Sequence, residues 1–361
     1  MKLEEGDWLV GVVTTPDRVE AQVVEWTPFG RLRRARRRLV EDVMSPPGFR
    51  AAPVSRQLAR VSASPKEEQA ADSWVQSVAG AVEQLLFGLR GGQVRLGVAV
   101  EGWLDARGEA VLAARGGPRV SDWPARLTTT LRARSIPLRE PVRAVCSRGA
   151  AAALGEVWSP LGALAGGGGG LVLDWGLEHC WAEVTGTRVL REGIGRPGAA
   201  GAPGLAELRR SWQEGRSGVA SLDVELGRRR LDALEHAAEA AFEVGQGAAS
   251  RLLERLQRAS AQPPAPAPGS RGGDVVVTGG LARLLGEPII RASMEQGLVQ
   301  RLLEREDASM AEGWLERVDG RATLGGGVLR QGADGGGALV GAAAWSLRDR
   351  LPSGQPTGGA R

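Results

Sequence analysis

The alternation of apolar and polar residues divides the chain into two halves with the same order of elements. Each half begins with three strand patterns, continues with a long helical periodicity, and then has a buried-strand pattern that enters a loop containing glycine. In the first half the predicted elements cover 8–13, 19–26, 31–40, 64–88, 94–100 and 124–134. In the second half they cover 171–174, 180–185, 188–191, 222–258, 274–278, 282–296 and 298–304. This order predicts two similar α/β lobes with mixed sheets, because hairpins precede the crossover helices.

The stretch 142–184 joins the two halves through a strand, an alanine-rich helix at 149–158 and a glycine run. We therefore expect an N-terminal lobe at 1–141 and a C-terminal lobe at 142–337. An apolar stripe at helical spacing predicts a packed C-terminal helix at 338–351. The segments rich in proline or glycine, which we expect to be loops or flexible, are 44–62, 262–273, 325–337 and 352–361.

Composition narrows the class of protein. A chain of 361 residues with 42% hydrophobic residues can form two domains with a large core. Its two cysteines, Cys146 and Cys180, are too few for a disulfide framework, which predicts a reducing, cytoplasmic location. The N-terminus lacks an apolar core and the chain has no long apolar run, so we expect neither a signal peptide nor a membrane span.

The positive charge rests almost entirely on arginine, and the net charge is +4. Six arginines lie between positions 31 and 38, which is typical of a solvated edge strand protected against aggregation. An acidic partner or a nucleic-acid backbone is the alternative, but the few aromatic residues in the run argue against nucleic acid. The pair His179 and Cys180, close to Asp174, indicates strand packing more than a metal site, because neighbouring residues of a strand point to opposite faces.

Several motifs in this order resemble the ROK family of bacterial sugar kinases and repressors, within the actin/hexokinase superfamily. The matching stretches are 94–111, 123–138, 145–156, 174–204, 274–285 and 341–347, and the resemblance extends over almost the whole chain. The resemblance implies a two-lobed, ribonuclease H-like fold with a mixed sheet and flanking helices in each lobe, in which the C-terminal helix at 338–351 crosses back to the N-terminal lobe. It also implies ATP and Mg²⁺ as cofactors and a sugar substrate between the lobes.

The residues that carry the family chemistry are missing. The aspartate of the family's first phosphate loop is replaced by Val13, and its glycine pair by Thr15 and Pro16, of which proline has no N–H to offer a phosphate. The family's catalytic aspartate corresponds to Arg148, which stays protonated and cannot act as a general base. The preceding asparagine corresponds to Ser147.

Little remains of the other binding loops. The resemblance implies cofactor-binding positions at Gly176 in the second phosphate loop and at Gly279, Gly280 and Leu281 beside the adenine; a tight strand-to-helix turn is the alternative for the last three. It implies substrate-binding positions at Gly102, Ser147 and Gly201, although the family's glutamate and histidine are absent after Gly201. The family's structural zinc is not expected, because no cysteine follows Cys180.

We therefore predict a catalytically inactive ROK-like protein that acts as a binding or scaffold module for an unidentified protein or small molecule, with a homodimer among the possible assemblies. An active, diverged ATP-dependent sugar kinase is the first alternative, with Asp174, Glu178, Asp105 or Asp17 as substitute metal or base groups. A nucleotide-switched, actin-like ATPase is the second, with Asp174 as a water-mediated Mg²⁺ ligand. If the protein is inactive, we expect Arg148 to lie within salt-bridge reach of Asp174 or Glu178 and to close the site.

Overall fold

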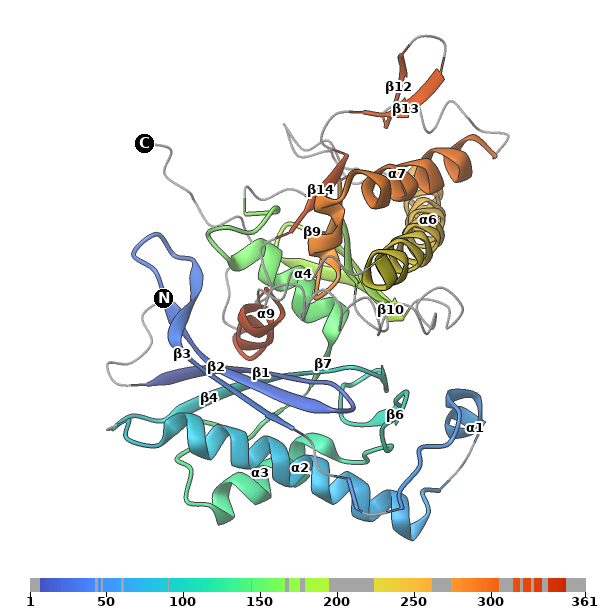
Figure 1. Ribbon diagram of the computed structural model, residues 1–361. Helices are drawn as coiled ribbons and strands as arrows, with labels where there is room; N and C mark the ends of the chain where they lie inside the picture. Colours follow the sequence, from blue (N-terminus) through green and yellow to red (C-terminus); the bar gives the residue numbers. More distant parts are fainter. Residues whose placement is uncertain are drawn as a thin grey trace.

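Two five-stranded sheets lie on either side of a central layer of two helices, α4 and α9 (Figure 1). In the computed structural model the described residues are 7–42, 45–46, 48–59, 62–89, 91–143, 145–165, 169–175, 179–194, 224–261, 274–304, 314–318, 321–325, 328–332 and 337–348. The two sheets have the same strand order when counted within each lobe. This confirms the two-lobed actin/hexokinase-like fold that the duplicated pattern and the resemblance implied.

The first sheet has the order β3-β2-β1-β4-β7. The first three strands form an antiparallel meander, and β4 and β7 run parallel to β1. Its outer face is covered by α2 and α3, while the short hairpin β5–β6 follows β4 (Figure 1). The bounds are β1 Trp8–Thr14, β2 Arg18–Trp26, β3 Leu32–Asp42, α2 Pro65–Leu86, β4 Val94–Val100, β5 Trp103–Leu104, β6 Val111–Ala113, α3 Trp123–Ala133 and β7 Cys146–Ser147.

The second sheet repeats the arrangement with the order β10-β9-β8-β11-β14. Here too a three-strand antiparallel meander is followed by two strands parallel to the first. A small hairpin, β12–β13, lies apart from the sheet. The bounds are β8 Gly169–Trp175, β9 His179–Thr185, β10 Arg188–Ile194, α6 Val224–Ala261, β11 Asp274–Thr278, the 3₁₀ helix η1 Ala282–Gly286, α7 Pro288–Leu303, β12 Leu315–Val318, β13 Arg321–Leu324 and β14 Leu329–Gln331.

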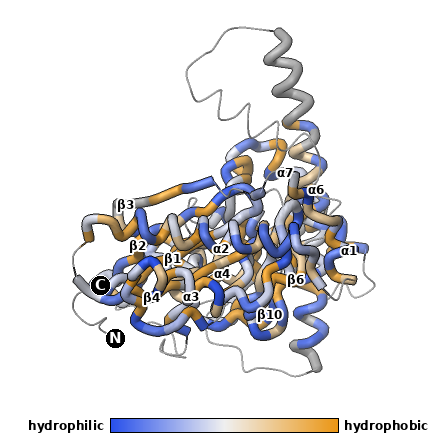
Figure 2. The backbone as a smooth tube through the Cα atoms, turned by 90° about the horizontal axis from the view of Figure 1, so that it is seen from below, coloured by the Kyte–Doolittle hydropathy of each residue, from blue (hydrophilic) through white to orange (hydrophobic). Residues whose placement is uncertain are grey.

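The two faces of each sheet bury different cores because successive residues of a strand point to opposite sides. In β8, Leu171 and Leu173 pack with α6 and α7, whereas Val172 packs with α4 and α9. In β1, Val10 and Val12 pack with α2 and α3. Strands buried on both faces explain why β1, β4 and β8 are nearly continuous apolar runs. Figure 2 shows these apolar segments gathered around β1, β4 and α4.

The central helices are α4 (Arg148–Trp158) and α9 (Gly337–Trp345). Glycines let their backbones come unusually close to their neighbours: a Cβ at Gly11 or Gly97 would overlap a carbonyl oxygen of α9, and one at Gly341 would overlap a carbonyl oxygen of α4. The C-terminal helix therefore contacts the first sheet, as expected, but it does so with more than one stripe. Val340 faces one core cluster and Leu339 another, so the helix is apolar on all sides.

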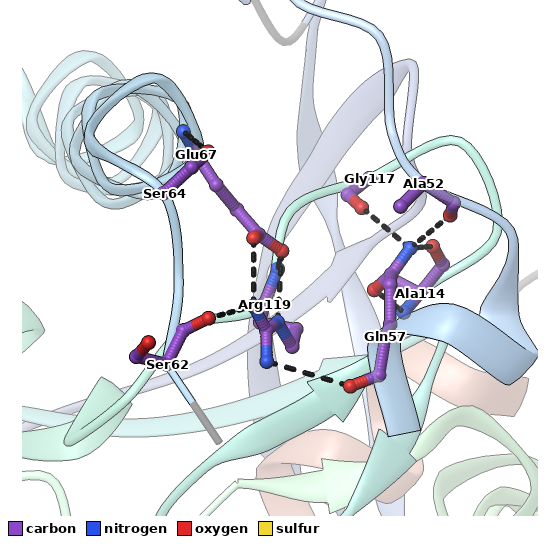
Figure 3. Close-up of polar contacts among 8 residues, drawn as sticks. All are labelled: Ala52, Gln57, Ser62, Ser64, Glu67, Ala114, Gly117 and Arg119. Carbon is purple, nitrogen blue, oxygen red and sulfur yellow. Dashed lines mark hydrogen bonds and ion pairs between the residues drawn. The ribbon is translucent and has the colours of Figure 1, made fainter. Parts of the chain in front are cut away.

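One predicted loop contains a helix, α1 (Val54–Ala59). Its Gln57 is buried; the side-chain amide donates to the carbonyls of Ala52 (2.7 Å) and Ala114 (2.9 Å) and accepts from the Ala114 N–H (3.1 Å) (Figure 3). Arg119 adds a two-point contact to Glu67, at 3.0 and 2.9 Å. These tertiary contacts hold the segment, and the three nearby prolines concealed it in the sequence pattern.

Other differences concern boundaries. The helical pattern at 282–296 is interrupted, because Pro288 starts a new helix that continues past 298 to Leu303. The glycine-rich stretch 325–337 includes the edge strand β14, paired with β11. Strand β7 still belongs to the first sheet, so the chain crosses to the second lobe at α4, a few residues after the expected boundary at 141. The flexible segments expected at 262–273 and 352–361 lie outside the described residues.

In the described part of the chain, no helix is both long enough and apolar enough to cross a membrane.

Candidate functional site

The site lies where strand ends from both lobes meet the first turn of α4. Strands β1 and β4 are parallel, so Thr14 and Glu101 emerge at the same edge of the first sheet, and the Glu101 N–H donates to the Thr14 carbonyl at 3.1 Å. Helix α4 begins directly after β7; the hydroxyl of its N-cap Ser147 accepts a hydrogen bond from the Ala150 N–H at 3.0 Å. Asp174 comes from the second lobe, near the end of β8.

Arg148 joins the two lobes through two carboxylates. Its Nη1 lies 2.6 Å from Oε2 of Glu101, and its Nε lies 2.5 Å from Oδ2 of Asp174. The three side chains are 14%, 6% and 2% exposed, respectively, so water screens these pairs poorly. The predicted contact between Arg148 and Asp174 is confirmed. Glu178, the other predicted partner, lies outside the described residues.

The charges in this cluster do not balance. Burial on its own would lower the pKa of Arg148, but the attraction of Asp174 and Glu101 outweighs it and raises that pKa. Burial raises the pKa of Glu101 and of Asp174, and Arg148 offsets only part of the effect. One guanidinium cannot neutralise two buried carboxylates, and Asp17 adds further repulsion to Glu101. The guanidinium is therefore permanently charged and has no capacity to accept a proton.

A second acidic contact flanks the cluster. The hydroxyl of Ser147 donates to Oε2 of Glu192 on β10 at 2.7 Å. Burial raises the pKa of Glu192, and this hydrogen bond offsets part of the rise. Burial also raises the pKa of the Cys146 thiol well above its ordinary value, so this cysteine is not an activated nucleophile. The Ser147 hydroxyl is thus engaged on both sides, by the Glu192 carboxylate and by the first turn of α4.

The β1–β2 turn, which corresponds to the family's first phosphate loop, is closed on itself. The Thr15 N–H donates to the Arg18 carbonyl at 2.9 Å, and the Thr15 hydroxyl donates to Asp17 at 2.6 Å. Pro16 has no N–H. Val13, at the position of the family's aspartate, is buried in the apolar cluster that includes Leu339 of α9. This turn offers little to an anionic ligand.

The loop 279–281 after β11 packs closely against the end of β8. Gly279 has φ +95°, and a Cβ there would overlap Oδ1 of Asp174. Leu281 is buried, and its N–H donates to the carbonyl of Trp175 at 3.0 Å. A Cβ at Gly280 would have no neighbour within 4 Å. A tight strand-to-helix turn thus explains Gly279 and Leu281 without a bound adenine. No neighbouring atom prevents a larger side chain at Gly280.

The remaining predicted site residues are dispersed. The Asp105 carboxylate accepts hydrogen bonds from the N–H groups of Glu109 (2.6 Å) and Ala110 (2.9 Å), which fix the β5–β6 turn. Burial would raise the pKa of Asp105, but these hydrogen bonds lower it. Gly102 is buried, and a Cβ there would clash with the Ala113 carbonyl oxygen at 2.7 Å. Gly176 and Gly201 lie outside the described residues.

Sequence reasoning missed Glu101, which supplies one of the two carboxylates that hold Arg148. The available signal was its place: it follows β4 directly, and the carboxyl end of β4 lies beside the start of α4 because β4 and β7 are parallel. An acidic residue between a strand and Gly102 also fits an ordinary loop, so the sequence pattern alone does not single it out.

ATP and Mg²⁺, the cofactors that the fold implies, do not fit the residues present. Buried carboxylates of Glu101 and Asp174 would repel phosphates, and in the β1–β2 turn the Thr15 N–H is already donated to Arg18 while Pro16 has none. Among the described residues, no group of three or more histidine, cysteine, aspartate or glutamate side chains is arranged to hold a metal ion.

Solved structures share this fold at low sequence identity. A ROK family glucokinase from Streptomyces griseus, in complex with glucose and AMPPNP, is 16% identical, with a TM-score of 0.53 over 94% of this chain and 99% of the other. A ROK hexokinase from Thermus thermophilus is 19% identical, with a TM-score of 0.50 over 95% and 99%. A ROK family transcriptional regulator, a homolog of the E. coli MLC protein, is 12% identical, with a TM-score of 0.54 over 95% and 78%.

No protein-family model matches the chain, and no curated protein matches its sequence. The resemblance to the ROK family is thus confirmed at the level of the fold: the chain has the two-lobed architecture of ROK kinases and regulators.

Proposed function

We propose that this chain is a ROK-like protein that does not transfer a phosphoryl group and acts as a binding or scaffold module. The observation that carries the proposal is Arg148. It stands where the family has its general base, and it is held by Glu101 and Asp174 in a buried ion-pair cluster. A general base contributes roughly 10²–10⁴ in rate, and a guanidinium cannot supply it.

Two further features support the proposal. In the β1–β2 turn the Thr15 N–H donates to Arg18, and Gly279 packs on Asp174, so neither loop needs a nucleotide to explain its structure. The same fold also occurs in a protein described as a ROK family transcriptional regulator, so this architecture is not tied to sugar phosphorylation.

A coupled assay with Mg-ATP and glucose, mannose, N-acetylglucosamine or N-acetylmannosamine tests the proposal. We expect no turnover above background, and calorimetry with Mg-ATP is expected to show no binding in the low micromolar range. Arg148→Ala and Asp174→Asn serve as variants that remove one partner of the cluster. Turnover by the wild-type protein that disappears in either variant would show that the chain is an active, diverged kinase.

A further inference from the structure

A cluster of arginines outside the lobe junction lies between α6 and strands β9 and β10. Arg251, Arg255 and Arg258 come from one side of α6, and Arg191 comes from β10; we refer to these four as the arginine cluster. Two glutamates, Glu183 and Glu254, are paired with them, so each glutamate is shared by two arginines. Arg255 is the most buried of the four at 18% exposure, whereas Arg191 and Arg258 are 44% and 45% exposed.

The two internal carboxylates are fully engaged. Glu183 on β9 contacts Arg255 through Oε1 (3.2 Å) and Arg258 through Oε2 (2.9 Å). Glu254 uses both oxygens to contact Arg251, at 3.0 and 3.1 Å, and lies 3.8 Å from Arg191. Each carboxylate is thus shared between two arginines. A guanidinium carries five N–H donors, so the exposed arginines have more donors than these oxygens can accept.

The cluster is also held in position. The guanidinium of Arg251 lies over the Trp181 ring, 4.7 Å from its centroid. Trp181 is 7% exposed, so Arg251 presents its charge outward and covers the indole. The cavity beneath the arginines, about 10 Å³, is too small for anything beyond a water molecule. An anionic partner therefore has to bind from outside, across the exposed guanidinium groups.

We propose that the arginine cluster is a docking surface for an acidic segment of a partner protein. The contacts to Glu183 and Glu254 show that its arginines already hold carboxylates from two sides. From Arg251 to Arg258 the helix rises by about 10 Å, a length matched by about three residues of an extended chain. Nucleic acid fits less well, because Trp181 is covered and offers no surface for base stacking.

This inference rests on the proposed function, because both assume that the chain acts by binding a partner. Its test uses residues of the arginine cluster alone and none of the residues at the lobe junction. Fluorescence anisotropy of a labelled glutamate octapeptide would be measured with the full chain at low salt and at physiological ionic strength. We expect binding that weakens with salt. The double variant Arg191→Gln/Arg258→Gln is expected to weaken it about tenfold, since it removes two charge-assisted contacts.

The matched control is Arg33→Gln/Arg143→Gln, which removes two exposed arginines that pair with glutamates elsewhere in the chain. It is expected to leave the affinity within about twofold, because the net charge of both double variants is the same. Circular dichroism confirms that both variants are folded. Absence of peptide binding at millimolar protein, equal weakening by the two double variants, or tighter binding of an oligothymidylate than of the peptide would each overturn the proposal. Turnover in the kinase assay would instead contradict the proposed function alone.

Discussion

Replacing Arg148 with methionine tests the energetic role of the ion-pair cluster. The substitution keeps much of the side-chain volume but leaves Glu101 and Asp174, only 6% and 2% exposed, without their cation. Removing one partner of a buried ion pair costs about 3–5 kcal/mol, because the other charge remains buried and unpaired. We expect Arg148→Met to lower the free energy of unfolding by about this amount at neutral pH.

The penalty should also depend on pH. Without the guanidinium, nothing offsets the burial that raises the pKa of both carboxyls, so the variant takes up protons in the folded state more readily than in the unfolded state. The loss of unfolding free energy in the variant should therefore become smaller as the pH falls. Each unit by which the substitution raises the pKa of one of these carboxyls accounts for about 1.4 kcal/mol of this change. Urea unfolding followed by tryptophan fluorescence, at several pH values, measures both effects.

Arg126→Met is the matched control. Arg126 also contacts two carboxylates, Glu68 at 3.1 Å and Asp72 at 2.5 Å, but these side chains are 46% and 70% exposed. Pairs of this kind contribute about 0–1 kcal/mol, so the control should lose little stability. A loss for Arg148→Met no larger than that of Arg126→Met would refute the reasoning that the cluster is a buried, mutually dependent set of charges.

Two further predictions concern the same site. Gly279→Ala should destabilise the protein by about 1–3 kcal/mol, because its Cβ would overlap the Asp174 carboxylate at a φ of +95°, whereas Gly280→Ala has room and should change the urea midpoint little; equal effects would contradict the packing explanation of this loop. Burial raises the pKa of Glu101 above its ordinary value of 4.5, so its contribution to stability is present at low pH and is lost as the pH rises through the folded-state value. Glu101→Gln removes that loss, so wild-type stability should fall more steeply than that of the variant between pH 4.5 and neutrality; parallel profiles would show that Glu101 titrates as it does in the unfolded chain.

The fold was predictable where periodicity and burial agree. The buried strand at 274–278 has the predicted bounds, and the long helix α6 differs from its prediction by only a few residues. The edge strand β14 was missed because its three residues lie in a glycine-rich stretch and are ordered by pairing with β11. Helix α1 was missed for a similar reason, since the contacts of Gln57 with Ala114 come from far along the chain.

The site was predictable only in part. Arg148 and Asp174 were brought together by the resemblance, because both correspond to positions that face the family's cleft, and the structure confirms the contact. Glu101 required the register of β4 against β7, which a single sequence does not reveal. The β1–β2 turn was identified in the sequence because the family's aspartate and glycine pair are replaced there. The hydrogen bond from Thr15 to Asp17 that closes the turn could be seen only in the structure.

Helix α9 gives this chain a particular order of assembly. It is the last described element, yet it touches β1, the first, through the close approach of Gly11. When the protein is synthesised, the apolar surface that includes Leu9, Val13 and Ala99 emerges early and stays uncovered until α9 leaves the ribosome. Contacts between such distant segments close slowly, and exposed apolar surface invites aggregation in the interval. The two lobes therefore reach their final packing only after α9 has been made.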